Sequence, residues 1–267
     1  TAIQMTELGL YVRTQRTGLA GVDLAYDLEE LATTYNTVGM VMMAQGQAQG
    51  KQRNPTAQTG LYEKAQELLR KAEMLTEQKD LMINRAPRIK LRAVTLNNLG
   101  CLYRRRGKLH SALKFLEKAL KLEQDLENAV GALDDPASTH LNLCATLSEM
   151  GKHGPAAEHA AAALRRTLYT MGLPHDVDPS DIPESQNELG NLLAIAFYNL
   201  GVAQDELKAS EDGLANIEKG VLVAQRFFRD TPKHRDMEHR RAELDKKVAI
   251  IRQNREAAQA EASDAGE

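Results

Sequence analysis

The side chains best placed for chemistry in this chain are amides rather than acids, bases or metal ligands. The seven histidines are scattered, and no His-Glu-x-x-His, glycine-rich phosphate loop or Cys-x-x-Cys motif occurs. We therefore expect no catalytic residues, no metal site, no cofactor and no enzymatic activity. Asparagine, however, recurs at Asn98, Asn142 and Asn199 in similar surroundings. Each carboxamide offers both donors and an acceptor, so the chemistry indicated is hydrogen bonding to a polypeptide main chain.

The composition indicates a helical protein without covalent cross-links. Hydrophobic residues make up 42% of the 267 residues, charged residues 27% and aromatics only 4%, so Leu, Ala, Met and Val must form the core. Cys101 and Cys144 are expected to be reduced core thiols, and His140 a packed core histidine. No apolar run approaches the roughly 20 residues that span a bilayer. We expect a cytoplasmic protein without membrane insertion. A narrower expectation is that it associates with the cytoskeleton or a cilium.

The elements that must position the asparagines repeat along the chain. A small residue at Gly100 is followed twelve residues later by Ala112, and the same interval separates Cys144 from Ala156 and Gly201 from Gly213. Further apolar or small residues follow each second position at +4 and +3. Two helices approach closely where such small residues meet, so the spacing predicts successive helical hairpins.

The motif Leu96-x2-Leu99-Gly100-x2-Tyr103, followed by Ala112-x3-Leu116-x2-Ala119, resembles the tetratricopeptide repeat. The lengthened repeats, the Asp-Pro turn at Asp135-Pro136 and the Leu-Asn-Asn-Leu-Gly core resemble those of kinesin light chains and of LGN-type scaffolds. This resemblance implies an all-α, right-handed superhelical solenoid of about four hairpins with a C-terminal cap helix. It also implies a protein–protein interaction scaffold.

The repeat spacing predicts the following division of the chain. Residues 1–20 form an N-terminal segment that ends a preceding helix, and residues 21–229 form the array. The four copies span about 32–83, 88–131, 136–172 and 184–229. In the first copy the two helices are further apart in sequence, and the Gln/Gly/Asn/Pro-rich stretch from Ala44 to Gly60 is predicted to be a loop. Residues 171–184, which hold three prolines, form a second predicted loop.

The C-terminal region admits two interpretations. Thr231 and Pro232 can start a helix, in which Met237, Leu244, Val248 and Ile251 recur at helical spacing within a strongly charged sequence. The first interpretation is a charged cap helix over residues 230–256 that covers the last hairpin, followed by a frayed tail at 257–267. The second is a coiled-coil contact with a partner through residues 232–256.

A binding groove is expected on the side lined by the first helix of each hairpin. There Asn98, Asn142 and Asn199 would hold the backbone of an extended partner peptide, as asparagines do in the families that the chain resembles. Arg104 and Arg105 would border the groove at a basic end, and Asp205 and Glu206 at an acidic end. Such a groove would fix the direction of a peptide that is acidic at one end.

Two alternative functions follow from other features. A structural subunit of a large cytoskeletal or axonemal assembly would bind through its convex face and the loops 44–60 and 171–184. A nucleic-acid binder would use residues 81–116, which contain no Asp or Glu. The absence of interleaved aromatics makes nucleic acid the weaker alternative. The basic patch of that segment comprises Arg85, Arg88, Lys90, Arg92, Arg106 and Lys108.

Overall fold

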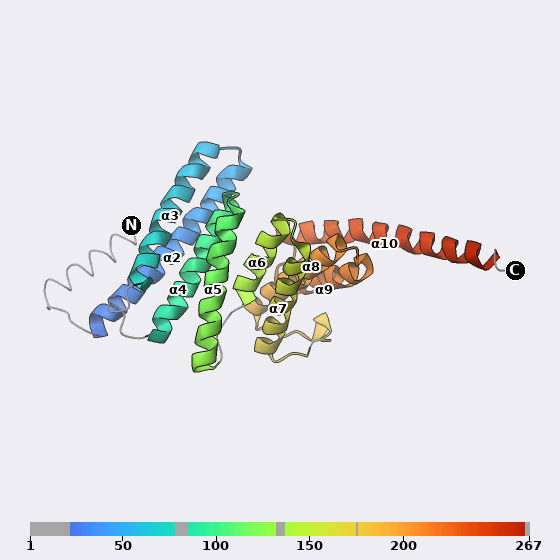
Figure 1. The fold of residues 1–267 in the computed structure, drawn as a ribbon. Coiled ribbons are helices and arrows are strands. Elements are labelled where there is room, and N and C mark those ends of the chain that lie inside the picture. Colours follow the sequence, from blue (N-terminus) through green and yellow to red (C-terminus); the bar gives the residue numbers. More distant parts are fainter. Residues whose placement is uncertain (1–21, 78–84, 132–136, 175, 265–267) are drawn as a thin grey trace. The chain divides into compact units, whose positions relative to one another are not determined.

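The computed structural model describes residues 22–77, 85–131, 137–174 and 176–264, and every regular element in these ranges is helical. The N-terminal segment predicted at 1–20 lies outside the described residues. The chain divides into two compact units, Thr1–Leu133 and Asp134–Glu267. The first holds two hairpins, and the second holds two hairpins followed by a single helix (Figure 1). The predicted all-α array of hairpins with a C-terminal cap helix is confirmed.

The first unit is built from two antiparallel pairs of helices. Their order and bounds are α2 (Val22–Lys51), α3 (Pro55–Glu77), α4 (Arg85–Arg105) and α5 (Leu109–Val130). The helices α2 and α4 also contact each other, and α3 contacts α4. The core between the two pairs contains Met43, Leu69, Leu99 and Leu102, all fully buried.

The second unit continues the pattern with shorter hairpins. Its elements are α6 (Ala137–Glu149), α7 (His153–Met171), the 3₁₀ turn η1 (Pro179–Asp181), α8 (Asn187–Glu206), α9 (Ser210–Phe227) and α10 (Pro232–Asp264). One large core joins α7, α8, α9 and α10. The segment between α7 and α8 is also part of this core, because Val177 and Ile182 are buried in it. Arg226 donates hydrogen bonds to the main-chain carbonyls of Pro179 and Ser180.

The small residues bring the paired helices together as the sequence predicts. A Cβ added at Gly100 would lie 2.5 Å from Cγ of Leu116, and one added at Gly201 would lie 2.5 Å from the carbonyl oxygen of Gly213. The third hairpin uses Cys144 and Ala156 at the corresponding positions, and both are buried. Helix backbones can approach this closely only where a side chain is absent or small.

All four hairpins of the described residues turn in the same way. The residue after the turn donates its N–H to a carbonyl five residues earlier: Asn54 to Gln49 at 3.0 Å, and Lys108 to Tyr103, Lys152 to Leu147 and Ala209 to Gln204 at 2.9 Å each. The residue before it has a positive φ, which Gly107 and Gly151 adopt without strain. In the last hairpin Lys208 takes this conformation with φ of 70°.

The predicted loop from Ala44 to Gly60 is wrong. Helix α2 continues to Lys51 and α3 begins at Pro55, so the turn is confined to a few residues between them. Gly46 and Gly50 are the physical reason. A Cβ at Gly46 would lie 2.7 Å from the ring of Tyr62, and one at Gly50 would lie 2.3 Å from the amide of Gln58. The segment with loop composition therefore extends α2 and α3, and its glycines let the two helices stay in close contact over this added length.

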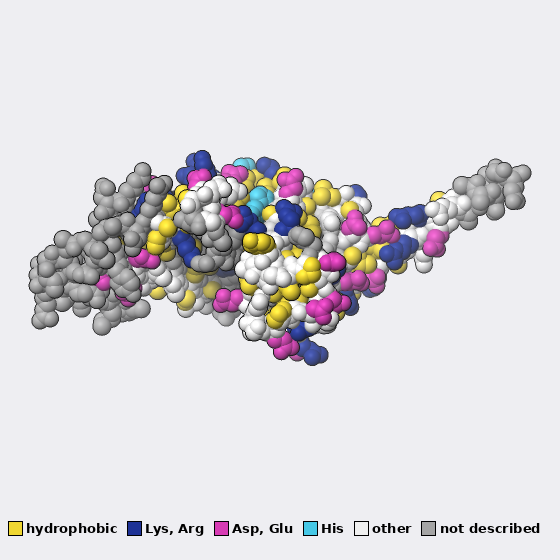
Figure 2. Space-filling model, turned by 90° about the horizontal axis from the view of Figure 1, so that it is seen from below, with side chains coloured by type: hydrophobic (Ala, Val, Ile, Leu, Met, Phe, Trp, Pro, Cys, Tyr) yellow, Lys and Arg dark blue, Asp and Glu magenta, His cyan; other side chains and the backbone are white. Residues whose placement is uncertain are grey.

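Helix α10 lies against α9 and buries a single narrow stripe. Met237, Leu244 and Val248 are each about 1% exposed in the core of the second unit. Thr231 accepts a hydrogen bond from the main-chain N–H of His234 and so caps the helix. The helix continues past residue 256 to Asp264, through the region predicted to be a frayed tail. Acidic and basic side chains are interspersed along its projecting part (Figure 2).

The close contacts lead to a paired prediction at two glycines. Gly201→Ala is expected to lower the free energy of unfolding by about 2 kcal/mol, because the methyl group would overlap the backbone of Gly213. The same substitution at Gly60, which has no atom within 4 Å of an added Cβ, is expected to raise it by about 0.5–1 kcal/mol through helix propensity. Urea denaturation monitored by circular dichroism measures both. Equal effects of the two substitutions would contradict the proposed packing.

Candidate functional site

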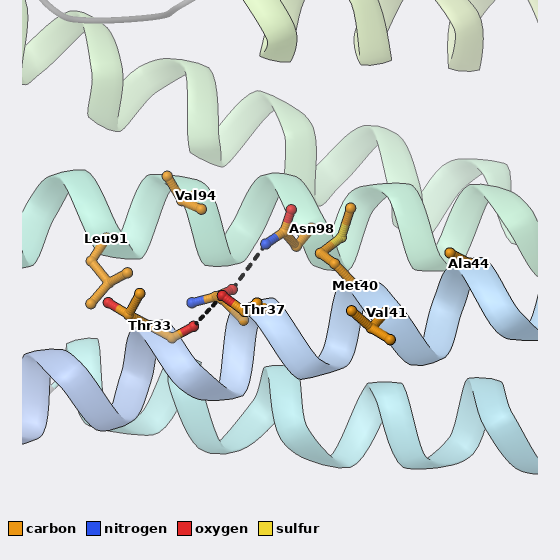
Figure 3. Close-up of a pocket in the computed structure, with 9 residues that line it drawn as sticks. Thr33, Thr37, Met40, Val41, Ala44, Leu91, Val94 and Asn98 are labelled. Atoms are coloured by element: carbon orange, nitrogen blue, oxygen red, sulfur yellow. Dashed lines mark hydrogen bonds between the residues drawn. The ribbon is translucent and has the colours of Figure 1, made fainter. Parts of the chain in front are cut away.

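A groove runs between α2 and α4 in the first unit. It has a volume of about 500 Å³ and is open to solvent. Side chains of both helices line it (Figure 3). Helices α2 and α4 are the first helices of their hairpins, so the groove lies on the side where the sequence predicts binding. Its apolar lining residues are Met40, Val41, Ala44, Leu91 and Val94. Its polar lining residues are Thr33, Asn36, Thr37 and Asn98.

Asn98 is held in this groove by a second asparagine. Its Nδ2 donates to Oδ1 of Asn36 at 3.0 Å, and Asn36 in turn donates to Oγ1 of Thr95 at 2.8 Å and to the carbonyl of Ala32 at 3.1 Å. Both asparagines are buried. This arrangement uses an N–H of Asn98 and does not use its Oδ1. The sequence did not indicate Asn36 as this partner, because the two asparagines are 62 positions apart.

Arg104 and Arg105 lie at the end of α4 and do not line this groove. Both side chains are half-buried. Nη1 of Arg105 donates to the main-chain carbonyl of Met43 on α2 at 3.3 Å, so this guanidinium links the two helices. A role for either arginine in selecting acidic residues of a partner stays a prediction.

The residues of the predicted basic patch occupy different environments. Arg88 is buried and donates to the carbonyl of Thr76 at 2.9 Å, near the end of α3. Arg92 pairs with Glu77 at 2.8 Å, and Arg106 donates to the side chain of Gln66. Lys90 and Lys108 are exposed. The side chain of Arg85 lies outside the described residues. Several of these cations thus hold α3 against α4 and its turn.

A second group of side chains, which the sequence did not suggest, joins α3, α4 and α5. The rings of Tyr103 and Phe115 stack with centroids 5.2 Å apart. The guanidinium of Arg70 lies 5.0 Å above the Phe115 ring and donates to the Tyr103 hydroxyl at 3.0 Å. It also pairs with Glu73 at 2.5 Å. These contacts strengthen the packing between the two hairpins of the first unit.

Asn142 and Asn199 lie on α6 and α8 in the second unit, and both are half-buried. These two helices contact each other, as α2 and α4 do in the first unit. Asn98 belongs to the first unit and the other two asparagines to the second. A single row formed by all three stays a prediction.

Asp205 is not an open acidic position on the groove. Its carboxylate is buried at the end of α8 and accepts hydrogen bonds from Ser210 at 2.7 Å, from Arg240 at 3.0 Å and from Lys247. Arg240 also lies 3.8 Å from Glu206. The acidic end predicted from Asp205 is therefore already occupied by two cations of α10. The sequence did not indicate these ion pairs, because Arg240 and Lys247 lie 35 and 42 positions from Asp205.

The surroundings of Asp205 favour its charged form. Burial alone would raise the pKa of this carboxyl, but the hydrogen bonds from Lys247 and Ser210 and the charges of Lys247 and Arg240 lower it overall. Further along the helix, Arg252 and Arg255 pair with Glu211 on α9 at 3.1 and 3.6 Å. Ion pairs thus accompany the apolar stripe that holds α10 in place.

The histidine and cysteine side chains singled out in the sequence lie in packed regions. His140 is buried on α6, and its Nδ1 lies 2.8 Å from Nδ1 of His159 on α7, so one ring donates to the other. Burial raises the pKa of the Cys144 thiol to about 11 and also raises that of Cys101. Both thiols are therefore protonated at neutral pH.

The described residues offer neither a metal site nor a membrane-spanning helix. They contain no group of three or more His, Cys, Asp or Glu side chains close enough to hold a metal ion. None of their helices is long and apolar enough to cross a membrane.

The Asp205 site predicts an acid-dependent loss of stability. Because its pKa is lowered on folding, the stabilisation is present above the ordinary carboxyl pKa of about 3.9 and is lost as the pH falls through the lower folded value. Asp205→Asn is expected to cost about 3 kcal/mol at neutral pH, since it leaves Arg240 and Lys247 without their buried anion. The difference from the wild type should shrink below about pH 4.

Urea denaturation at a series of pH values checks this prediction. Glu218→Gln, an isosteric change at an exposed position of α9, serves as the control and should stay within about 0.5 kcal/mol of the wild type. A constant difference between Asp205→Asn and the wild type at all pH values would contradict the role of the ionised carboxylate.

Comparisons with known proteins agree with this geometry. Residues 92–124, which cover most of α4 and α5, match the tetratricopeptide repeat family. The crystal structure of BtubC (BKLC) from P. vanneervenii is similar over 96% of this chain and 93% of that chain, with a TM-score of 0.56 and 17% sequence identity. At this identity the similarity shows the fold alone. The comparison with curated proteins gives no match.

Proposed function

We propose that the chain is a non-catalytic protein–protein interaction scaffold, because residues 92–124 match the tetratricopeptide repeat and lie within an array of similar hairpins. It binds an extended segment of a partner protein on the side lined by the first helices of the hairpins. The observation that carries this proposal is the solvent-open groove between α2 and α4, which combines aliphatic walls with the carboxamide of Asn98.

The amides supply the binding chemistry. An extended peptide presents N–H and C=O groups that lack partners along its length, and a carboxamide satisfies either kind. Asn98 contributes Oδ1 in the first unit, and Asn142 and Asn199 contribute half-buried carboxamides in the second. Contacts of this kind hold a backbone whatever its side chains are, and the groove walls then add selectivity.

The two alternatives have less support in the described residues. A structural subunit that binds through loops 44–60 and 171–184 loses most of the first loop, because α2 and α3 extend into it. The second is anchored in the core of its unit by Val177 and Ile182, and most of its other described residues are exposed. A nucleic-acid binder would use the basic segment, where Arg88, Arg92 and Arg106 make contacts within the protein. As part of the same proposal, the scaffold acts in the cytoplasm and associates with cytoskeletal structures.

Replacing the asparagines tests the scaffold. The measurement is a pull-down from extracts of the native cells, quantified by mass spectrometry. With Asn98→Ala/Asn142→Ala/Asn199→Ala, a small set of proteins is expected to be recovered in at least tenfold lower amount than with the wild type. Each lost amide contact contributes about 1 kcal/mol, so three account for at least that factor. The matched control is Asn128→Ala/Asn254→Ala, at exposed positions on α5 and α10, and it should retain the same partners.

A second variant separates binding from folding. Asn98→Ala also removes the hydrogen bond to Asn36, so Asn142→Ala/Asn199→Ala is tested beside the triple variant, and both are compared with the wild type by thermal denaturation. A partner set that is unchanged in the folded triple variant contradicts the groove as the working surface.

A further inference from the structure

The groove between α2 and α4 has a lining without charge. None of the nine residues that form it is acidic or basic, although 27% of the chain is charged. Two of its aliphatic residues are unusually exposed, Val41 at 49% on α2 and Val94 at 43% on α4. They leave apolar surface on both walls of the same groove. A partner that covers it gains by burying apolar atoms, and would lose by burying a charge there without a counter-ion.

The dimensions of the groove limit what can fill it. From Thr33 to Ala44 the groove follows α2 for roughly 16 Å at the helical rise of 1.5 Å per residue. An extended segment of about five residues covers this length, and its alternate side chains, about 7 Å apart, point the same way. The volume of about 500 Å³ lies within the range of pockets that enclose small ligands or side chains.

The polar residues of the groove are arranged to hold a backbone. The hydrogen bond from Asn98 Nδ2 to Asn36 orients the carboxamide and leaves Oδ1 to accept an N–H from the partner. The hydroxyls of Thr33 and Thr37 donate to main-chain carbonyls of their own helix, at 2.8 and 3.0 Å, so their methyl groups are available for apolar contact. Asn36 is thus a positioning residue for Asn98.

We propose that the α2–α4 groove binds an uncharged, extended segment of a partner protein through two aliphatic side chains in alternate positions, with Asn98 accepting a backbone N–H between them. This inference rests on the proposed scaffold function and defines the chemistry of its partner in the first unit. The aliphatic side chains pack against Val41 and Val94, and a carboxylate or ammonium group in either position is rejected because the lining offers it no counter-ion.

The test is a selection with a phage-displayed library of random linear peptides against the full chain. Peptides enriched on the wild type are synthesised, and their dissociation constants are measured by fluorescence anisotropy. Val41→Asp and Val94→Asp each place a carboxylate in the groove at an exposed position, so the fold tolerates them. Met74→Asp is the matched control, since Met74 is 60% exposed on α3 and does not line the groove.

The proposal expects enriched peptides that share two aliphatic residues separated by one residue. They should bind Val41→Asp and Val94→Asp at least tenfold more weakly than the wild type, and Met74→Asp equally well. Changing either aliphatic residue of the peptide to Asp should weaken binding by a similar factor. Asn36→Leu, which removes the orienting acceptor, should weaken binding at least threefold.

Two results would overturn the proposal, and they differ in what they say about the scaffold. Selected peptides centred on charged residues, or peptides that bind the two Val→Asp variants normally, would overturn the aliphatic chemistry and leave the asparagine-dependent scaffold standing. A wild type that enriches no peptide, together with an unchanged partner set in the asparagine variant, would overturn both proposals.

Discussion

The close approach of paired helices at small residues is the constraint on which the rest of the structure depends. Gly100, Cys144 and Gly201 let the first helix of a hairpin lie directly against the second, and the large side chains beside them then fill the core. The same contact extends along α2 and α3 through Gly46 and Gly50. Because the hairpins are held from within, the outer side of each first helix is left to line a surface. The α2–α4 groove is one consequence of this division of roles.

Helix α10 is held in place by ion pairs as well as by apolar packing. Helix α10 buries only Met237, Leu244 and Val248 as a continuous stripe, and its cations pair with carboxylates of α8 and α9. Among these pairs the Asp205 site is buried, so its contribution depends on the carboxylate keeping its charge and its partners. The apolar stripe predicted as either a cap or a coiled-coil seam is used within the chain itself.

The groove combines exposed aliphatic residues with buried asparagines that are hydrogen-bonded to each other. Val41 and Val94 remain exposed because no neighbouring helix of the unit covers them, and they carry the apolar surface that a partner would bury. Asn36 and Asn98 are buried and bonded to each other, so their geometry is set before any partner arrives. A preorganised amide costs less to bind than one that must first be ordered. The first unit therefore combines a buried, preorganised polar contact with exposed apolar surface.

The sequence by itself determined the hairpins, their close contacts, the cap helix and the buried thiols, because these depend on spacing within one hairpin or along one helix. It failed from Ala44 to Gly60, where glycines that suit a loop instead permit helix contact. Only the tertiary structure decided which polar groups remain open. Asp205 meets Lys247, Arg105 meets the carbonyl of Met43, and Asn98 meets Asn36, all across elements far apart in the chain. Local periodicity specifies the face on which a residue lies, whereas its partners depend on how separate helices pack.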